Sequence, residues 1–180
     1  MPDTLRETLE ETDQDDLPLE LFNVVVGLIF DSLVREFPMW RRLTPGYLGK
    51  SFETLVDFAE AEEVLPTGRI RQAKDNYMLR SNVPPDMYIK ESVDWLVAEG
   101  FLLGRNTPIG RDGIQSLTEH TLSARTLEIL NRPMPGLGQS YANRLSDAAR
   151  AGGGEAGKAA IGEIVGQIIG AATKSMAGLG

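Results

Sequence analysis

The most informative stretch of the sequence is VDWLVAEGFLLGRNTPIGRDGIQSLTEHTLSARTLEIL, residues 93–130. Its first part has apolar residues at helical spacing and predicts a helix over residues 87–99. The candidate core residues of this helix are Tyr88 or Met87, Val93, Trp95, Leu96 and Val97. Gly100 is placed to end the helix, because glycine readily adopts the left-handed conformation that follows a last helical turn.

The residues after Gly100 predict a small β-hairpin. Residues 101–103 are apolar and indicate a short strand, residues 104–113 form a turn-rich loop, and residues 114–118 indicate a returning strand. Residues 122–131 then fit a helix, with Ser123 near its N-cap and Pro133 just after its end.

Three further helices are expected upstream of this stretch. Residues 19–36 carry apolar side chains on more than one side, which predicts a helix at the centre of the core. Residues 37–50 contain the turn signals Pro38 and Pro45-Gly46 and predict a loop. Residues 51–64 and 69–80 are expected to form helices, separated by a break at Pro66 and Gly68, and the second has a basic outer face.

The order of helix, apolar strand, arginine- and glycine-rich turn, strand and helix resembles the winged-helix proteins, which are relatives of the helix-turn-helix proteins. The residues that carry the resemblance are Val93–Leu102, and Leu117-Thr118 leading to Leu127–Leu130. It covers about residues 20–131 and implies a recognition helix, a two-stranded wing and a closing helix. The fold class expected is mainly α with a small β-hairpin (α+β), and a fold alone does not imply a function.

The composition changes after Asn131. Residues 133–180 contain 11 of the 19 glycines, so we expect a linker at 132–139 and a C-terminal helical appendage at 140–180. Within the appendage, residues 140–150 predict a short helix and residues 155–176 a longer one.

The longer helix is amphipathic, and glycines recur along it every four residues. Because each glycine costs a helix about 1 kcal/mol relative to alanine, this spacing predicts the close approach of another backbone. Three alternatives stay open: folding back onto the winged body, self-association through the glycines as in a glycine zipper, and lying on a membrane surface. The membrane is the least favoured, because the polar face has few basic residues. The candidate docking or self-association residues are Ile161, Gly162, Ile164, Val165, Gly166, Ile168, Ile169 and Gly170.

The net charge of −8 is concentrated at the N-terminus. Residues 1–20 carry eight acidic residues and one basic residue, and the remainder of the chain is close to neutral. We therefore expect a disordered acidic tail at 1–18 before a winged-helix-like domain at 19–131. The overall acidity does not exclude a nucleic-acid partner.

Several lysine and arginine residues in the predicted domain suggest where DNA would contact the protein. However, the presumed recognition helix carries Glu91, Asp94 and Glu99 against Lys90 alone. A helix that reads the major groove usually presents Arg, Lys, Asn or Gln, so these acids weaken the DNA interpretation. The candidate nucleic-acid contacts are Arg69, Arg71, Lys74, Arg80, Lys90, Arg105 and Arg111.

The composition excludes several chemistries. With no cysteine, the chain has no disulfide, no thiolate zinc site and no cysteine nucleophile. His120 is the single histidine, and we expect it to be a structural residue that is exposed or hydrogen-bonded. Residues 152–158 match the spacing GxxxxGK, but Ala159 stands where a phosphate-binding loop has Ser or Thr. We expect no catalytic residue, no metal and no cofactor.

These observations predict a non-enzymatic winged-helix-type module for regulation or assembly, which binds a protein partner or itself through the C-terminal helix. The alternatives are a sequence-specific DNA-binding transcriptional regulator and a membrane-surface-associated effector.

The N-terminal residues are acidic, whereas a secretory signal peptide begins with basic residues before an apolar segment. The most apolar run, residues 24–30, is too short to span a bilayer. A cytoplasmic protein of bacterial type is therefore expected.

Overall fold

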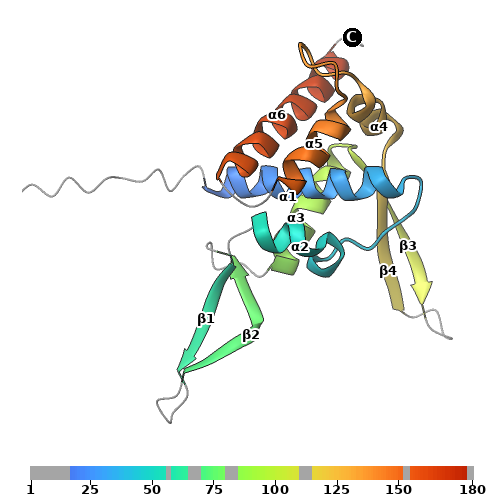
Figure 1. Ribbon diagram of the computed structural model, residues 1–180. Helices are drawn as coiled ribbons and strands as arrows, with labels where there is room; N and C mark the ends of the chain where they lie inside the picture. The colour runs from blue at the N-terminus through green and yellow to red at the C-terminus, as the bar shows by residue number, and fades with distance from the viewer. Residues whose placement is uncertain are drawn as a thin grey trace, which may run out of the picture.

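The computed structural model describes residues 17–55, 58–64, 70–79, 85–109, 115–151 and 155–177. These residues form helices and two antiparallel hairpins (Figure 1). In chain order the elements are α1 (Leu17–Glu36), α2 (Pro45–Leu55), β1 (Phe58–Val64), β2 (Ile70–Leu79), α3 (Pro85–Ala98), β3 (Leu102–Ile109), β4 (Gln115–Leu122), α4 (Ala124–Asn131), α5 (Tyr141–Arg150) and α6 (Glu155–Ala177). The expected fold class, mainly α with a small β-hairpin, is confirmed.

Helix α1 runs through the middle of the helical body, with α5 and α6 on one side and α2 on the other (Figure 1). Its residues Val25, Val26, Ile29 and Phe30 are fully buried. A helix enclosed in this way has apolar residues around most of its circumference. The central helix predicted from residues 19–36 is therefore confirmed.

The hairpin β3–β4 and helix α4 follow α3 as predicted, and the strands are longer than expected. The register pairs Leu102 with Leu122 at one end and Ile109 with Gln115 at the other. Gly100 has a φ of 74° at the end of α3, as a C-terminal glycine requires. Ser123 is the N-cap of α4, and its side chain accepts a hydrogen bond of 3.2 Å from the backbone N–H of Thr126.

A backbone bridge joins the segment after α1 to β4. The N–H of Arg41 donates to the carbonyl of His120 at 2.9 Å, and the N–H of His120 donates to the carbonyl of Arg41 at 2.7 Å. The Arg41 side chain forms an ion pair with Glu36, and the Tyr47 hydroxyl donates to the same carboxylate at 3.1 Å. Burial, and then the charge of Glu36, raises the pKa of Tyr47 to about 12.

Helix α2 begins earlier than expected. The N–H of Tyr47 donates to Oγ1 of Thr44 at 3.2 Å, so Thr44 caps the helix. Pro45 stands directly after this cap, at the first helical position, where its missing N–H removes no intrahelical hydrogen bond. The prediction of a loop through residue 50 is therefore wrong for residues 45–48, whereas Gly49, with a φ of 64°, interrupts the helix with a kink.

The helices predicted at 51–64 and 69–80 are also wrong over most of their length. Residues 58–64 and 70–79 form β1 and β2, which pair as a hairpin that extends away from the helical body (Figure 1). The register places Glu63 opposite Arg71 and Glu62 opposite Gln72. Residues 59–62 alternate alanine and glutamate, which is the period of a strand, and the helical interpretation of 51–64 did not take this into account.

Helix α3 buries a different set of side chains from the one predicted. Ile89, Val93 and Leu96 are in the core, whereas Trp95 is 36% exposed and Val97 is 37% exposed. Assigning Trp95 and Val97 to the core is therefore wrong. Trp95 lies on the surface of the core, stacked on the ring of Phe101 with 5.8 Å between the ring centroids.

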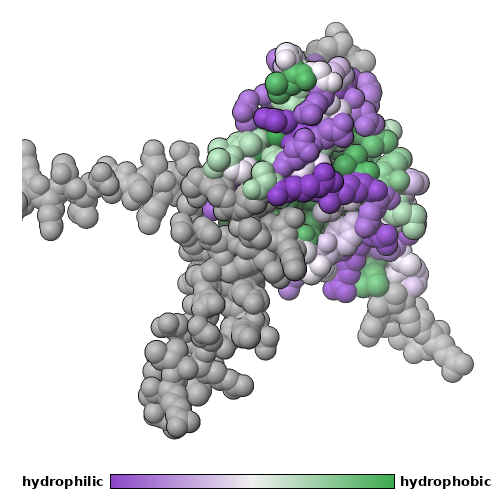
Figure 2. Space-filling view, in the orientation of Figure 1, coloured by the Kyte–Doolittle hydropathy of each residue, from purple (hydrophilic) through white to green (hydrophobic). Residues whose placement is uncertain are grey.

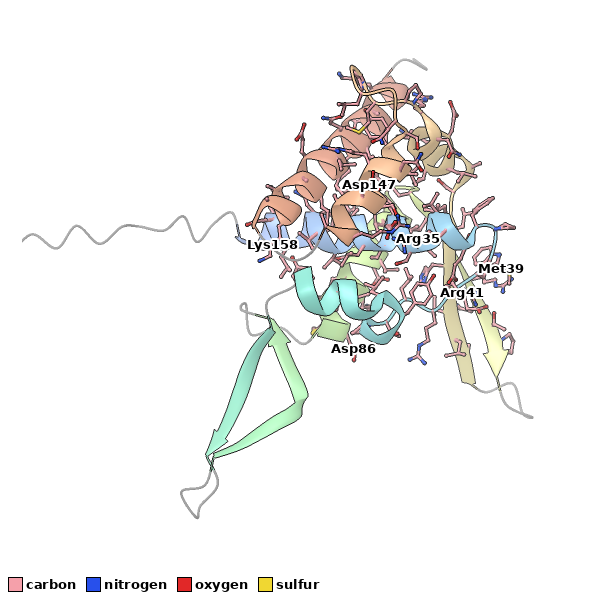
Figure 3. The ribbon with its side chains drawn as sticks, viewed as in Figure 1. Arg35, Met39, Arg41, Asp86, Asp147 and Lys158 are labelled. Atoms are coloured by element: carbon pink, nitrogen blue, oxygen red, sulfur yellow. The ribbon has the colours of Figure 1, made fainter. Side chains whose placement is uncertain are left out.

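Helix α6 folds back onto α1, as one of the three alternatives anticipated. Ile161, Val165 and Ile168 are fully buried, and one hydrophobic core contains residues from both the predicted 19–131 domain and the predicted 140–180 appendage. Arg35 of α1 lies where α5 crosses α1 (Figure 3). The Arg35 side chain pairs with Asp31 and donates to Oγ of Ser146 at 3.3 Å.

Among the residues described, no helix combines the length and the apolar character needed to cross a membrane.

Candidate docking groove

A groove of about 650 Å³ runs along the side of α6 that faces away from the core. The buried residues Ile161, Val165 and Ile168 fix the orientation of the helix, because they pack into the body. The opposite side of the helix therefore forms the floor of the groove. The α6 residues that line the groove are Glu163, Gly166, Gln167, Gly170, Ala171 and Lys174.

The wall of the groove is the loop between α4 and α5. A two-residue bridge between Pro133 and Ser140 closes this loop, and the N–H of Met134 donates to the carbonyl of Gln139 at 2.7 Å. Gly136 has a φ of 80°, which a residue with a side chain rarely adopts. The loop contributes Met134, Pro135, Leu137 and Tyr141 to the groove.

Leu137 is the most exposed of the large apolar residues in the groove. It is 55% exposed, whereas Met134 and Tyr141 are buried beneath it. Because more than half of its surface remains in solvent, Leu137 gains only part of the free energy that full burial of a leucine provides. The groove thus presents an apolar side chain on a wall that is already formed.

The glycines of α6 do not serve the packing of this chain in the way we predicted. A Cβ added at Gly166 or Gly170 would meet no atom within 4 Å, and one at Gly162 would meet only Cβ of Asn23, at 4.0 Å. The close approach between α6 and the body occurs instead at Gly27 of α1. Gly166 is exposed, so the groove has a floor on which a second backbone can lie close to α6.

The groove has opposite charges near its two ends. Glu163 and Lys174 lie eleven positions apart along α6, a separation of about 16 Å along the helix axis. Both side chains are exposed. The side-chain amide of Gln167 donates to Oε1 of Glu163 at 3.2 Å and holds that carboxylate at the rim.

The predicted self-association residues therefore fall into two groups. Ile161, Ile164, Val165 and Ile168 are buried in the chain's own core, and Ile169 is partly buried. Gly166 and Gly170 line the groove, and Gly162 lies one turn before them. The sequence pattern indicated the glycines, but nothing in the sequence indicated that the loop of Leu137 would form the facing wall.

Of the predicted nucleic-acid contacts, the structure describes the side chains of Lys90 and Arg105, and each of these two is paired with a carboxylate. Arg69, Arg80 and Arg111 lie outside the described residues, and Arg71 and Lys74 belong to strand β2 rather than to a helix. Lys90 is paired with Asp94, with 2.7 Å between Nζ and Oδ2.

Arg105 is engaged on both sides of its guanidinium group. It pairs with Glu119 at 2.9 Å, and its guanidinium carbon lies 4.6 Å from the centre of the Trp40 ring. Hydrogen bonds from Thr107 and Arg105 lower the pKa of Glu119, so this carboxylate stays charged at neutral pH. Arg105 of β3 is therefore paired within the β3–β4 hairpin and stacked on Trp40.

A second, smaller cleft of about 380 Å³ lies between α3 and the β3–β4 hairpin. His120 lines it and is 8% exposed, and its Nδ1 atom has no hydrogen-bond partner among the described residues. Burial lowers the pKa of His120, although the charge of Asp94 acts in the opposite direction. The side chain is thus buried, which excludes the exposed alternative expected for this histidine.

The GxxxxGK spacing at residues 152–158 follows a helix rather than a strand. Helix α5 ends at Arg150, and Gly157 and Lys158 belong to the first turns of α6. Among the described residues, no group of three or more histidine or acidic side chains could hold a metal ion.

Comparisons with known proteins give no relative on which a function could be based. No family model, no curated protein and no solved structure matches the chain. The geometry of the groove on α6 is therefore the basis for a functional proposal.

Proposed function

We propose that this chain is a non-enzymatic regulatory or assembly module of the winged-helix type, and that it binds a helix of a protein partner in the α6 groove. The observation that carries the proposal is the position of Gly166 and Gly170, which line an open groove at points where an added Cβ would meet no atom within 4 Å. Each costs α6 about 1 kcal/mol relative to alanine. A second backbone lying against them would explain why side chains are missing there.

The chemistry of the groove suits a helical partner better than a small ligand. Its floor is small, Leu137 offers an apolar contact, and Glu163 and Lys174 provide a polar rim. Protein interfaces combine an apolar centre with a polar rim in this way, and amphipathic helices commonly dock into such grooves. On the face shown in Figure 2, hydrophobic residues form several separate groups among hydrophilic ones.

The winged-helix part of the proposal is supported by the order of elements. Helices α1, α2 and α3 precede the β3–β4 hairpin and the closing helix α4. One feature departs from the resemblance, because the β1–β2 hairpin separates α2 and α3 where a helix-turn-helix has a turn of three or four residues. This departure, together with the pairing of Lys90 and Arg105 with carboxylates, makes a protein partner a better candidate than DNA.

The membrane alternative is less well supported than docking. The isoleucines of α6 that would have to enter the lipid, Ile161, Ile164 and Ile168, are buried against the body. A helix binds a membrane surface through an exposed apolar face. The side of α6 that remains open carries glycine, glutamine and charged residues instead.

Site-specific photo-crosslinking in living cells tests the proposal. A photo-reactive residue at position 167, on the groove, is expected to give adducts with a polypeptide, and Leu137→Asp is expected to reduce them. The matched control is the same residue at position 91, an exposed site on α3 outside the groove. Adducts at position 167 that are no stronger than at position 91, or that persist unchanged in Leu137→Asp, would contradict the proposal.

A further inference from the structure

We infer that the helix bound in the groove is α6 of a second copy of this chain, related to the first by a two-fold axis and lying antiparallel to it. This inference rests on the proposed docking function and names its partner. It starts from the groove-lining residues of α6, which are Glu163, Gly166, Gln167, Gly170, Ala171 and Lys174. In an antiparallel pair centred between residues 168 and 169, every one of these positions lies opposite another member of the same set.

The opposed positions are complementary in size and in charge. Glu163 lies opposite Lys174, Gly166 opposite Ala171, and Gln167 opposite Gly170. A two-fold interface presents the same surface from both copies, so each contact occurs twice. The arrangement therefore gives two Glu163–Lys174 ion pairs at the ends and small residues at the centre.

Charge also selects the direction of the second helix. A parallel pair in register would place Glu163 against Glu163 and Lys174 against Lys174, and like charges in contact oppose association. The antiparallel pair turns the same two residues into attractive contacts. Both side chains are exposed, and neither forms an ion pair with another described residue. The ammonium group of Lys174 and the carboxylate of Glu163, which accepts a hydrogen bond from Gln167, are therefore available for an ion pair with a partner.

The loop wall adds an apolar contact to the ion pairs. Leu137 stands 55% exposed beside the glycine floor, and the two-fold axis places one such leucine on each side of the paired helices. Leucine side chains gain free energy when a partner covers them. Close backbone approach at Gly166 and Gly170 would bring the second helix within reach of this wall.

Charge reversal in the full chain tests the inference. Glu163→Lys carries two positive residues on the groove, and Lys174→Glu carries two negative ones, so each variant alone repels its own copy. Analytical ultracentrifugation over a wide range of concentrations is expected to show a wild-type dimer and a dissociation constant roughly tenfold higher or more for each single variant. Glu91→Lys on α3, a charge reversal away from the groove, is expected to leave the dimer unchanged.

Mixing the two charge-reversed variants is the decisive experiment. Their heterodimer would have opposite charges at both ends, so an equimolar mixture is expected to form dimers again. Native mass spectrometry would show these dimers at the mass of one copy of each variant. Circular dichroism checks that each variant is folded, and both positions are exposed. A monomeric wild type, dimers insensitive to the reversals, or a mixture that does not recover would overturn the inference.

These outcomes are separable from a failure of the proposed function. A monomeric wild type whose position 167 still crosslinks to a different polypeptide overturns the second-copy partner and leaves groove docking in place. A monomeric wild type without groove-dependent crosslinks overturns both. Crosslinks from position 167 to the same chain, together with recovery in the mixture, support both.

Discussion

Gly27 of α1 lies so close to Ile161 of α6 that a methyl group on the glycine would overlap Cγ2 of the isoleucine. The same methyl group would stand 3.3 Å from Cδ1 of Leu145 and 3.3 Å from Cγ2 of Val165. This one position therefore sets how closely α5 and α6 approach α1. None of the three regularly spaced glycines of α6 has this role.

Gly27→Ala is expected to destabilise the protein. Overpacking a filled core costs about 1–3 kcal/mol, and this outweighs the gain of about 1 kcal/mol that alanine brings to a helix. We expect a net loss of up to about 2 kcal/mol in the free energy of unfolding, measured by urea denaturation. The matched control is Gly166→Ala, where an added Cβ meets no atom within 4 Å, and we expect a gain of about 0.5–1 kcal/mol in dilute solution. Equal stability of the two variants would contradict the packing at Gly27.

Ile168→Ala and Ile169→Ala are expected to differ although the residues are neighbours of the same type. Ile168 is fully buried, and its truncation is expected to cost about 2–5 kcal/mol. Ile169 is only partly buried, so its truncation removes less contact and is expected to cost about half as much. Thermal unfolding of both variants measures the difference, and a greater loss for Ile169→Ala would mean that α6 is rotated from the orientation described.

Thr126→Val is expected to destabilise the junction between the hairpin and α4. The Thr126 hydroxyl donates to the carbonyl of Phe101 at 2.8 Å, and the side chain is fully buried. Valine keeps the shape but removes this hydrogen bond. Because the carbonyl still accepts from the N–H of Ser123, the expected loss is about 0.5–1.5 kcal/mol. Thr118→Val removes a comparable hydrogen bond to Asn106 on the surface and is expected to change stability by no more than about 0.5 kcal/mol. Similar losses in the two variants would refute this account of Thr126.

His120 is expected to titrate below the ordinary histidine pKa of about 6.5. Burial lowers the pKa of this residue in the folded state, so below pH 6.5 the unfolded chain binds more protons than the folded one. The neutral imidazole therefore makes its full contribution to the free energy of unfolding above about pH 6.5. This contribution is lost as the pH falls towards the lower pKa of the folded state. Because the chain has one histidine, NMR of its imidazole protons gives the pKa without assignment. A midpoint at or above 6.5 would contradict the burial of His120.

The parts of the fold that could be predicted are those where local signals agree. Helix α1 followed from an apolar run, α4 from Ser123 before an apolar period, and the end of α3 from Gly100. Each signal acts within a few residues, so no long-range information was required.

The parts that could not be predicted depend on contacts between distant residues. The bridge between Arg41 and His120 joins segments almost eighty positions apart, and no local pattern marks either residue. The wall that Leu137 adds to the groove becomes apparent only once α6 has folded back beside the loop. Gly27 lacks the regular spacing of Gly166 and Gly170, so it gave no signal although it makes the closer contact.

The hairpin of β1 and β2 has a consequence for the stability of this protein. It stands between α2 and α3, and antiparallel strands return the chain to the side from which it left, whatever their length. Doubling the length of such an excursion adds only about 0.6 kcal/mol of closure entropy. A longer or shorter excursion between α2 and α3 is therefore expected to change the stability of the helical body little.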